Sequence, residues 1–290
     1  MKLGMNVLLW TAAATEEHLP LLDSLRAWGY DGVEFPMFSP DCSPWATLAA
    51  KLDHLGLGRT AVTIMPEAGN PISPDPAVRQ AGLDHLRACL DACAVLGADR
   101  LVGPMYSPCG KLVGRGPIPE EWNWAVETLR VAAEHAEDVG LTLAVEPLNR
   151  FETNYLNCME QAVRLVEEVG HPRLGILYDT FHANIEEKDP VGAARLAGPR
   201  LAHVHLSEND RSTPGEGHVP WPQTFTALRE TGYDDWLTVE AFGRAMPEVA
   251  AATCIWRDML TSEEALAREA AEFIRAGWSA PRGREKENAR

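Results

Sequence analysis

The chain has 290 residues, 46% of them hydrophobic, and carries 26 Lys and Arg residues against 42 Asp and Glu residues, a formal net charge of −16. This length and composition are sufficient for one large globular core. A strongly acidic chain is not attracted to the phosphate backbone of DNA or RNA, so we expect no nucleic-acid partner.

The N-terminus and the cysteines favour a cytoplasmic protein. Residues 1–10 lack the longer apolar stretch and the small-residue cleavage site of a signal peptide. No apolar run reaches the roughly 18 residues that a spanning helix needs, so we expect no membrane span. The six cysteines form no CxxC pair, and we interpret them as reduced thiols. Cys89 and Cys93, four residues apart, are expected to pack in the core on one helix face.

Eight short apolar runs along the chain have strand character. The predicted strands are residues 3–9, 31–37, 59–65, 100–106, 142–146, 174–179, 201–205 and 236–242. Helical patterns alternate with them, several closed by a glycine such as Gly29, Gly56 or Gly97. The predicted helices are residues 16–28, 44–55, a long helix that follows the loop 66–76 and ends at 96, and 120–139, 158–169, 190–196, 221–231 and 262–276.

A regular strand–helix alternation of eight units predicts a parallel sheet closed into a (β/α)8 TIM barrel. We expect one domain over residues 1–280, followed by a disordered polar tail at 281–290. The stretch 246–259 fits neither pattern and is left unassigned.

Four of the predicted strands end in a metal-ligating side chain. Glu146, Asp179, His205 and Glu240 are separated by 33, 26 and 35 residues, each close to one strand–helix unit. A charged group at the end of a buried strand is costly unless something pairs with it. Because the carboxyl ends of barrel strands meet at one face, these four side chains should converge there. Two glutamates, one aspartate and one histidine predict a site for a divalent metal.

Five segments together resemble a known family. They are Asp31-Gly-Val-Glu34, Glu146-Pro-Leu-Asn-Arg-Phe-Glu152, Asp179-Thr-Phe-His-Ala-Asn184, His203-Val-His-Leu-Ser-Glu-Asn-Asp-Arg211 and Thr238-Val-Glu-Ala-Phe242. The chain resembles the sugar isomerase and epimerase superfamily of xylose-isomerase-like barrels. Within it, the chain most resembles ketose 3-epimerases of the D-tagatose and D-psicose (allulose) type. The segment Met5 to Trp10 is less typical of these epimerases.

The resemblance implies specific roles for seven residues. The metal ligands would be Glu146, Asp179, His205 and Glu240, with manganese as the usual ion and cobalt or magnesium as substitutes. The sugar-binding residues would be Glu152, His182 and Arg211. The family also implies a homodimer or homotetramer.

The resemblance further implies that the enzyme inverts C3 of a free ketohexose or ketopentose. A divalent metal stabilises the enediolate that forms when the weakly acidic C3 proton is removed. Two carboxylates on opposite faces of that carbon can remove and return the proton. Glu146 and Glu240, on strands three apart in the barrel, are the predicted acid/base pair. We expect a free sugar in preference to a sugar phosphate, because the loops after the last two strands contain no basic cluster beyond Arg211 and Arg244.

Several further residues are candidates for the site. Glu34 is another strand-end acid, and His203 shares parity with His205, which places it inside the barrel one layer below. Trp10, Trp122 and Trp124 could wall a sugar site, although ordinary packing is the expected role of each.

Other functions remain open at this stage. The same metal site could serve an aldose–ketose isomerase, or an epimerase or dehydratase of inositol derivatives or keto acids. A DNA-repair nuclease of the superfamily would use more metals, more histidines and a basic surface, which the charge of −16 disfavours. A non-catalytic, metal-stabilised binding module is the remaining alternative.

Overall fold

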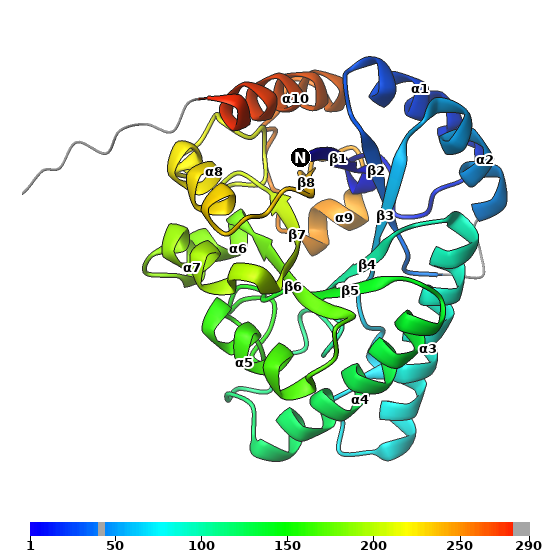
Figure 1. Cartoon of the computed structure of the whole chain (residues 1–290), viewed down its shortest axis with the longest axis vertical. Coiled ribbons are helices and arrows are strands. Elements are labelled where there is room, and N and C mark those ends of the chain that lie inside the picture. The colour runs from blue at the N-terminus through cyan, green and yellow to red at the C-terminus, as the bar shows by residue number, and fades with distance from the viewer. Residues whose placement is uncertain (40–43, 281–290) are drawn as a thin grey trace, which may run out of the picture.

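Eight parallel strands close into a barrel surrounded by helices in this computed structural model (Figure 1). The structure describes residues 1–39 and 44–280, so the predicted tail 281–290 lies outside the described residues. The strands are β1 (Lys2–Asn6), β2 (Gly32–Pro36), β3 (Gly58–Val62), β4 (Arg100–Gly103), β5 (Thr142–Val145), β6 (Leu174–Asp179), β7 (Leu201–Leu206) and β8 (Trp236–Val239). Each strand pairs with its sequence neighbours, and β8 closes on β1. The predicted single-domain TIM barrel is confirmed.

Helices form the outer layer. They are α1 (Leu19–Ala27), α2 (Trp45–Leu55), α3 (Pro76–Leu96), α4 (Pro119–Asp138), α5 (Met159–Val169), α6 (Thr180–Glu186), α7 (Pro190–Ala197), α8 (Trp221–Glu230), α9 (Pro247–Ala252) and α10 (Glu263–Ser279). In Figure 1, α10 completes the ring between α8 and α1. Cys89 and Cys93 are buried on α3, as predicted. No helix in the described part of the chain is both long enough and apolar enough to cross a membrane.

The strands alternate between two cores, because successive side chains of a strand point to opposite faces. Side chains such as Leu143 and Val145 pack outward in the large core beneath the helices. Val62, Val102 and Ala144 belong to a second, smaller core. The same alternation places polar side chains inside the barrel, where Asn6, Glu34, Thr60, His203, His205 and Thr238 are all at most 2% exposed.

Several strands are shorter than the sequence predicts. The predicted first strand, residues 3–9, ends at Asn6, whose side chain accepts from the backbone N of Leu8 (2.9 Å) and starts the 3₁₀ turn Val7–Leu9. The third, fourth and eighth strands stop three residues before their predicted ends. At the end of β4, Gly103 adopts a φ of 122°, and a Cβ there would lie 2.3 Å from the carbonyl oxygen of Thr63, so only glycine fits this position.

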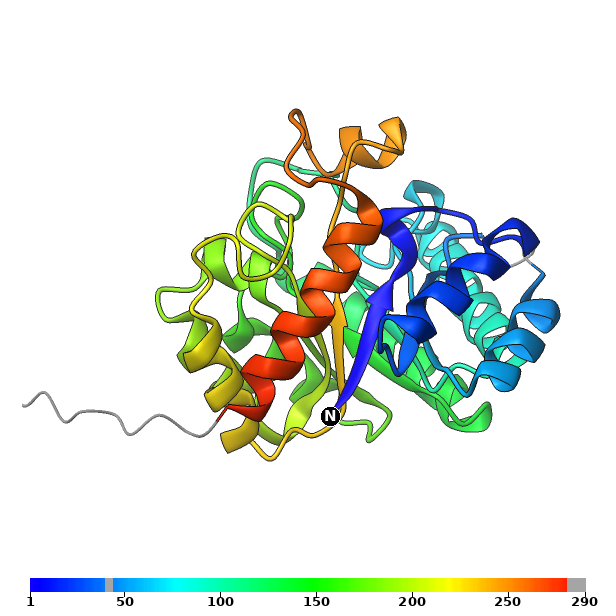
Figure 2. The same cartoon turned by 90° about the horizontal axis from the view of Figure 1, so that it is seen from above.

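Two short helices at the carboxyl end of the barrel were not predicted. α6 begins directly after Asp179, whose carboxylate accepts from the backbone N of Phe181 (2.6 Å) and of His182 (3.1 Å). α9 lies within the unassigned stretch 246–259. Figure 2 shows α9 above the carboxyl ends of the strands, opposite the N-terminus. Both helices therefore belong to the face where barrel enzymes carry their active sites.

Candidate functional site

Four side chains from neighbouring strands converge at the carboxyl end of the barrel. Asp179 ends β6 and His205 lies in β7, whereas Glu146 and Glu240 come directly after β5 and β8. One ligand atom from each residue lies within 4.8 Å of the other three, and all four residues are buried. The structure therefore brings together the four residues that the sequence analysis placed at one point.

The strands hold Glu146 and Glu240 even though neither residue lies within one. The backbone N of Glu146 donates to the carbonyl of Gly103 (3.2 Å), and that of Glu240 donates to the carbonyl of Leu206 (3.3 Å). Each glutamate thus continues the hydrogen bonding of its strand by one residue. The carboxylates are positioned by the barrel itself and not by a loose loop.

The donor set fits a divalent cation. Nδ1 of His205 lies 3.4 Å from Oε1 of Glu240 and 3.7 Å from Oδ2 of Asp179. It lies 3.8 Å from Oε1 of Glu146. This nitrogen is buried and makes no hydrogen bond to any described residue, which is costly unless something binds it. Three carboxylates and one imidazole directed at a common point could hold a metal such as Mn²⁺.

Crowding of the acids shifts their pKa values. Burial raises the pKa of Glu240 to about 8, and the charges of Glu146 and Asp179 add to this effect against the opposing effect of His205. Burial also raises the pKa values of Glu146 and Asp179. Burial would lower the pKa of His205, but nearby carboxylates, first Glu34 and then Glu240, raise it well above its ordinary value. A bound cation would relieve the repulsion among the three acids.

A pocket of about 210 Å³ lies next to this cluster. Glu146 and Glu240 line it, whereas Asp179 and His205 are not among its lining residues. The two glutamates are therefore the members of the cluster that face a bound molecule. The rest of the pocket is largely apolar and includes residues of α9, so this unassigned stretch of the sequence forms part of the site.

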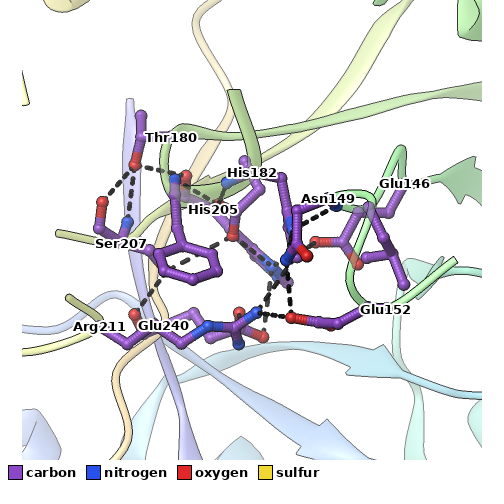
Figure 3. Close-up of polar contacts among 12 residues, drawn as sticks. Glu146, Asn149, Glu152, Thr180, His182, His205, Ser207, Arg211 and Glu240 are labelled. Carbon is purple, nitrogen blue, oxygen red and sulfur yellow. Dashed lines mark hydrogen bonds and ion pairs between the residues drawn. The ribbon is translucent and has the colours of Figure 1, made fainter. Parts of the chain in front are cut away.

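Glu152, His182 and Arg211 line the same pocket. Nη2 of Arg211 donates to Oε1 of Glu152 (3.0 Å) and lies 3.3 Å from Nε2 of His182 (Figure 3). Nε2 of His182 in turn lies 3.6 Å from Oε1 of Glu146. The structure thus joins the three predicted sugar-binding residues to the predicted metal ligands in one polar group.

The hydrogen bonds of His182 fix the direction of its ring. The backbone N of Asn149 donates to Nδ1 of His182 (3.0 Å). Burial, together with the charge of Arg211, lowers the pKa of His182 well below its ordinary value, so the ring is neutral. A neutral ring that accepts at Nδ1 carries its proton on Nε2. His182 therefore presents a hydrogen-bond donor to the pocket.

Arg211 is held in an unusual backbone conformation. Its φ of 62° lies in the left-handed region, where few residues other than glycine are found. The guanidinium carbon lies 4.1 Å from the ring centre of Phe181 and 4.9 Å from that of Phe242. The backbone N of Phe242 also donates to the carbonyl of Arg211 (2.9 Å). These contacts stabilise a strained residue, which is typical of functional positions.

Three further polar residues, which the sequence did not single out, support this group. Asn6 donates through Nδ2 to Oε1 of Glu240 (3.2 Å). Asn149 donates through Nδ2 to Oε1 of Glu152 (2.8 Å). Ser207 donates through Oγ to the carbonyl of Glu240 (2.7 Å). Asn6 and Ser207 each lie where an apolar run ends, which is the same signal that identified the metal ligands. Amide and hydroxyl side chains are common at such positions, so this signal does not distinguish them.

The remaining candidates have clear positions. His203 is buried inside the barrel one layer below His205, as its parity predicts, and Glu34 contacts both rings. The three tryptophans do not line the pocket. Trp122 stacks near Tyr155 and Trp124 packs against Arg79, which agrees with the packing role expected of them.

Comparisons with known proteins extend over nearly the whole chain. The chain is 34% identical over 278 residues to a ketose 3-epimerase of Arthrobacter globiformis, which covers 95% of this chain and 96% of the relative. It is 31% identical over 284 residues to an L-ribulose 3-epimerase of Mesorhizobium japonicum, and this match covers 97% of this chain and 95% of the relative. These relatives are named as epimerases, enzymes of the isomerase class.

The fold of the chain also matches that of a solved epimerase structure over nearly its whole length. The crystal structure of a D-allulose 3-epimerase from Methylomonas sp. in complex with D-allulose superimposes with a TM-score of 0.90 at 29% identity. The match covers 95% of this chain and 96% of that one. A family model described as a xylose isomerase-like TIM barrel matches residues 22–277. With this match and the closed eight-stranded barrel, the chain belongs to the xylose isomerase-like TIM barrel family.

Proposed function

We propose that the protein is a metal-dependent ketose 3-epimerase that inverts C3 of free ketohexoses or ketopentoses. One observation carries this proposal: Glu146 and Glu240 face the same pocket and belong to a four-residue cluster suited to a divalent metal. The names of the relatives, which match over nearly the full length, support the same reaction.

Four residues would hold the metal in this proposal. They are Glu146, Asp179, His205 and Glu240, whose donor atoms lie close together and are hard enough for Mn²⁺, with Co²⁺ or Mg²⁺ as substitutes. When bound, the ion supplies Lewis-acid stabilisation of negative charge on the sugar oxygens next to the reacting carbon.

The two glutamates would transfer the proton. One removes the proton from C3, which gives a cis-enediolate, and the other returns a proton to the opposite face and so inverts the carbon. Glu146 and Glu240 follow β5 and β8, which are three strands apart around the barrel. That separation supports their placement on two sides of a sugar in the pocket.

The remaining polar residues would orient the sugar. His182 offers the Nε2 proton as a donor, Arg211 offers its guanidinium, and Glu152 accepts hydrogen bonds from hydroxyl groups. The ion pair of Arg211 with Glu152 (3.0 Å) and the hydrogen bond from Asn149 to His182 (3.0 Å) leave them preorganised before a sugar binds. Binding energy is then used for orientation and is not lost to ordering side chains.

The charges that line the pocket favour a free sugar. The described lining residues include four glutamates, namely Glu146, Glu152, Glu240 and Glu248. Among these lining residues, the only Lys or Arg is Arg211. Because Arg211 is already paired with Glu152, the described residues of the lining offer no unpaired Lys or Arg to bind a phosphate group. The acidic lining would also repel one.

We further propose that the enzyme works in the cytoplasm as a homodimer or homotetramer, supported by its membership of this family. Light scattering of the purified protein tests the assembly, and a monomeric mass would contradict it.

The reaction itself is tested with metal-free protein reloaded with Mn²⁺, Co²⁺ or Mg²⁺. Incubation with D-fructose, D-tagatose and L-ribulose should give in each case a second ketose that differs at C3. Glu146→Gln should slow this reaction by about 10²- to 10⁴-fold, whereas the exposed control Glu230→Gln, which removes a surface ion pair with Arg195, should not. An aldose product would indicate an isomerase, and loss of water from an inositol derivative would indicate a dehydratase. Turnover of no sugar by either protein would indicate a binding module.

A further inference from the structure

Glu34 is a buried acid that the proposed reaction does not use. It lies in the middle of β2, is 0% exposed, and is not among the residues that line the pocket. It therefore touches neither a bound sugar nor the solvent. An acid buried in this way is costly unless its oxygens are fully hydrogen bonded.

Both oxygens of Glu34 meet donors from other strands. Oε1 accepts from Nδ2 of Asn6 (3.1 Å) and lies 2.7 Å from Nε2 of His205. Oε2 accepts from Oγ1 of Thr60 (2.8 Å) and lies 2.9 Å from Nε2 of His203. Four N–H or O–H groups thus surround the two oxygens of Glu34, an arrangement that fits an ionised side chain. Glu34 is therefore a carboxylate, which can only accept hydrogen bonds.

This contact decides which nitrogen of His205 is available to a metal. Nε2 faces the Glu34 carboxylate, so Nε2 must carry a proton. Nδ1 faces the three carboxylates of the cluster and makes no hydrogen bond to any described residue. Metal binding requires the neutral imidazole, which carries one proton, and the nitrogen without that proton offers the lone pair. The lone pair is therefore on Nδ1, which faces the carboxylates of Glu146, Asp179 and Glu240.

We infer that Glu34 is a positioning residue that fixes the orientation and proton arrangement of His205, so that Nδ1 faces the metal. The inference rests on the proposed function only in that it assumes a metal at the cluster. A carboxylate behind a metal-binding histidine generally raises the basicity of the ring and restricts its rotation. Asn6 extends the same support to a second ligand, because its Nδ2 also donates to Oε1 of Glu240 (3.2 Å).

The cluster of Glu34, His203 and His205 is better explained in this way than as a second metal site. Two ligand atoms on one ion are separated by about 3 Å or more, because each lies about 2.0–2.2 Å from its centre. The contacts from Glu34 to His205 and His203 are 2.7 and 2.9 Å, which are ordinary hydrogen-bond distances. These short contacts leave no space for an ion between the atoms.

Nuclear magnetic resonance of the wild-type protein tests the inference without any variant. In Mg²⁺-loaded protein labelled with ¹⁵N-histidine, His205 should show a slowly exchanging, downfield proton on Nε2 and no proton on Nδ1. A proton on Nδ1, with Nε2 bare, would overturn the inference. Mg²⁺ is diamagnetic, so the ring signals remain observable.

Metal affinity gives the second test. Glu34→Gln keeps the shape of the side chain but removes the charge, and it should weaken Mn²⁺ binding by about 10- to 100-fold. It should also shift the Nε2 proton of His205 upfield. Thr60→Val is the matched control, because Thr60 is equally buried and contacts Glu34 but not His205. It should change the Mn²⁺ affinity by less than about threefold.

The two tests separate this inference from the proposed function. Mn²⁺ affinity is measured without a sugar, so a protein that is no epimerase can still support the role of Glu34. A folded Glu34→Gln variant with wild-type Mn²⁺ affinity would refute the role even if epimerase activity is found. Equal losses in both variants would mean that Glu34 acts only through packing. At saturating Mn²⁺, the kcat of Glu34→Gln should recover towards the wild-type value, whereas its KM should change little.

Discussion

His205 and Glu240 come from neighbouring strands, and Nδ1 of the histidine lies 3.4 Å from Oε1 of the glutamate. Burial raises the pKa of Glu240 to about 8. A carboxyl group with a raised pKa stays protonated up to that pH, and a metal must displace its proton. We predict that the Mn²⁺ affinity falls as the pH decreases from 8 to 6, by up to about tenfold per unit for each proton displaced.

Calorimetric titration of Mn²⁺ in two buffers of different ionisation enthalpy measures this proton release directly. The raised pKa values of Glu146 and Asp179 act in the same direction. An affinity that is constant from pH 6 to 8, with no proton released, would show that the cluster does not bind the metal through these carboxylates.

Replacement of either glutamate should separate proton removal from epimerisation. With Glu146→Gln or Glu240→Gln at saturating Mn²⁺, epimerisation should fall by about 10²- to 10⁴-fold. The remaining carboxylate can still exchange the C3 proton of the one epimer that faces it. In D₂O, each variant should therefore introduce deuterium at C3 of one ketose of the pair, and the two variants should prefer opposite ketoses.

Mass spectrometry of the recovered, unepimerised sugars reads out this exchange. Glu152→Gln is the control, because Glu152 binds the sugar in our proposal and transfers no proton. It should raise KM and retain exchange with both ketoses. Epimerisation within tenfold of wild type in either of the other variants would remove that glutamate from the acid/base pair.

Arg211→Lys tests whether the shape of the guanidinium matters beyond its charge. Arg211 forms an ion pair with Glu152, and its guanidinium packs against the rings of Phe181 and Phe242. A lysine keeps the charge but has one compact donor group and stacks poorly. We predict a decrease in kcat/KM of about 10- to 100-fold, mainly through KM. Arg257→Lys, at an exposed ion pair with Asp210, should have no effect, and equal kinetics for the two variants would contradict the predicted role.

Glu208 should hold the loop that carries Arg211. Its carboxylate accepts from the backbone N of Gly215 (2.8 Å) and Val219 (3.0 Å) and from Nε1 of Trp221 (2.8 Å). Glu208→Ala leaves the buried donors of Val219 and Trp221 unpaired, which should reduce the free energy of unfolding by about 1–3 kcal/mol. Hydrogen exchange in residues 209–219 should become faster, whereas Glu230→Gln should change neither quantity measurably. Unchanged exchange in Glu208→Ala would show that the loop is held by other contacts.

The fold and the composition of the cluster followed from one repeated feature of the sequence. An apolar run ends in an acid or a histidine four times, at Glu146, Asp179, His205 and Glu240, and parallel strands bring such ends together. The resemblance to ketose epimerases supplied Glu152, His182 and Arg211, which the structure places beside the cluster. Their roles remain predictions until they are measured.

Features that depend on long-range contacts could not be predicted in the same way. Asn6 and Glu240 are 234 residues apart, and Glu34 and His205 are 171 apart. No local pattern distinguishes such polar residues from ordinary ones at strand ends. α6 was missed because its start overlaps the strand-end residue Asp179, which caps the helix and faces His205 at the same time.

Anomalous diffraction from a crystal soaked with Mn²⁺ and D-fructose tests the central claim most directly. The account predicts one manganese peak within bonding distance of Glu146, Asp179, Glu240 and Nδ1 of His205, with C3 of the sugar between the two glutamate carboxylates. A manganese peak elsewhere, or a sugar whose C3 lies out of reach of both glutamates, would contradict it.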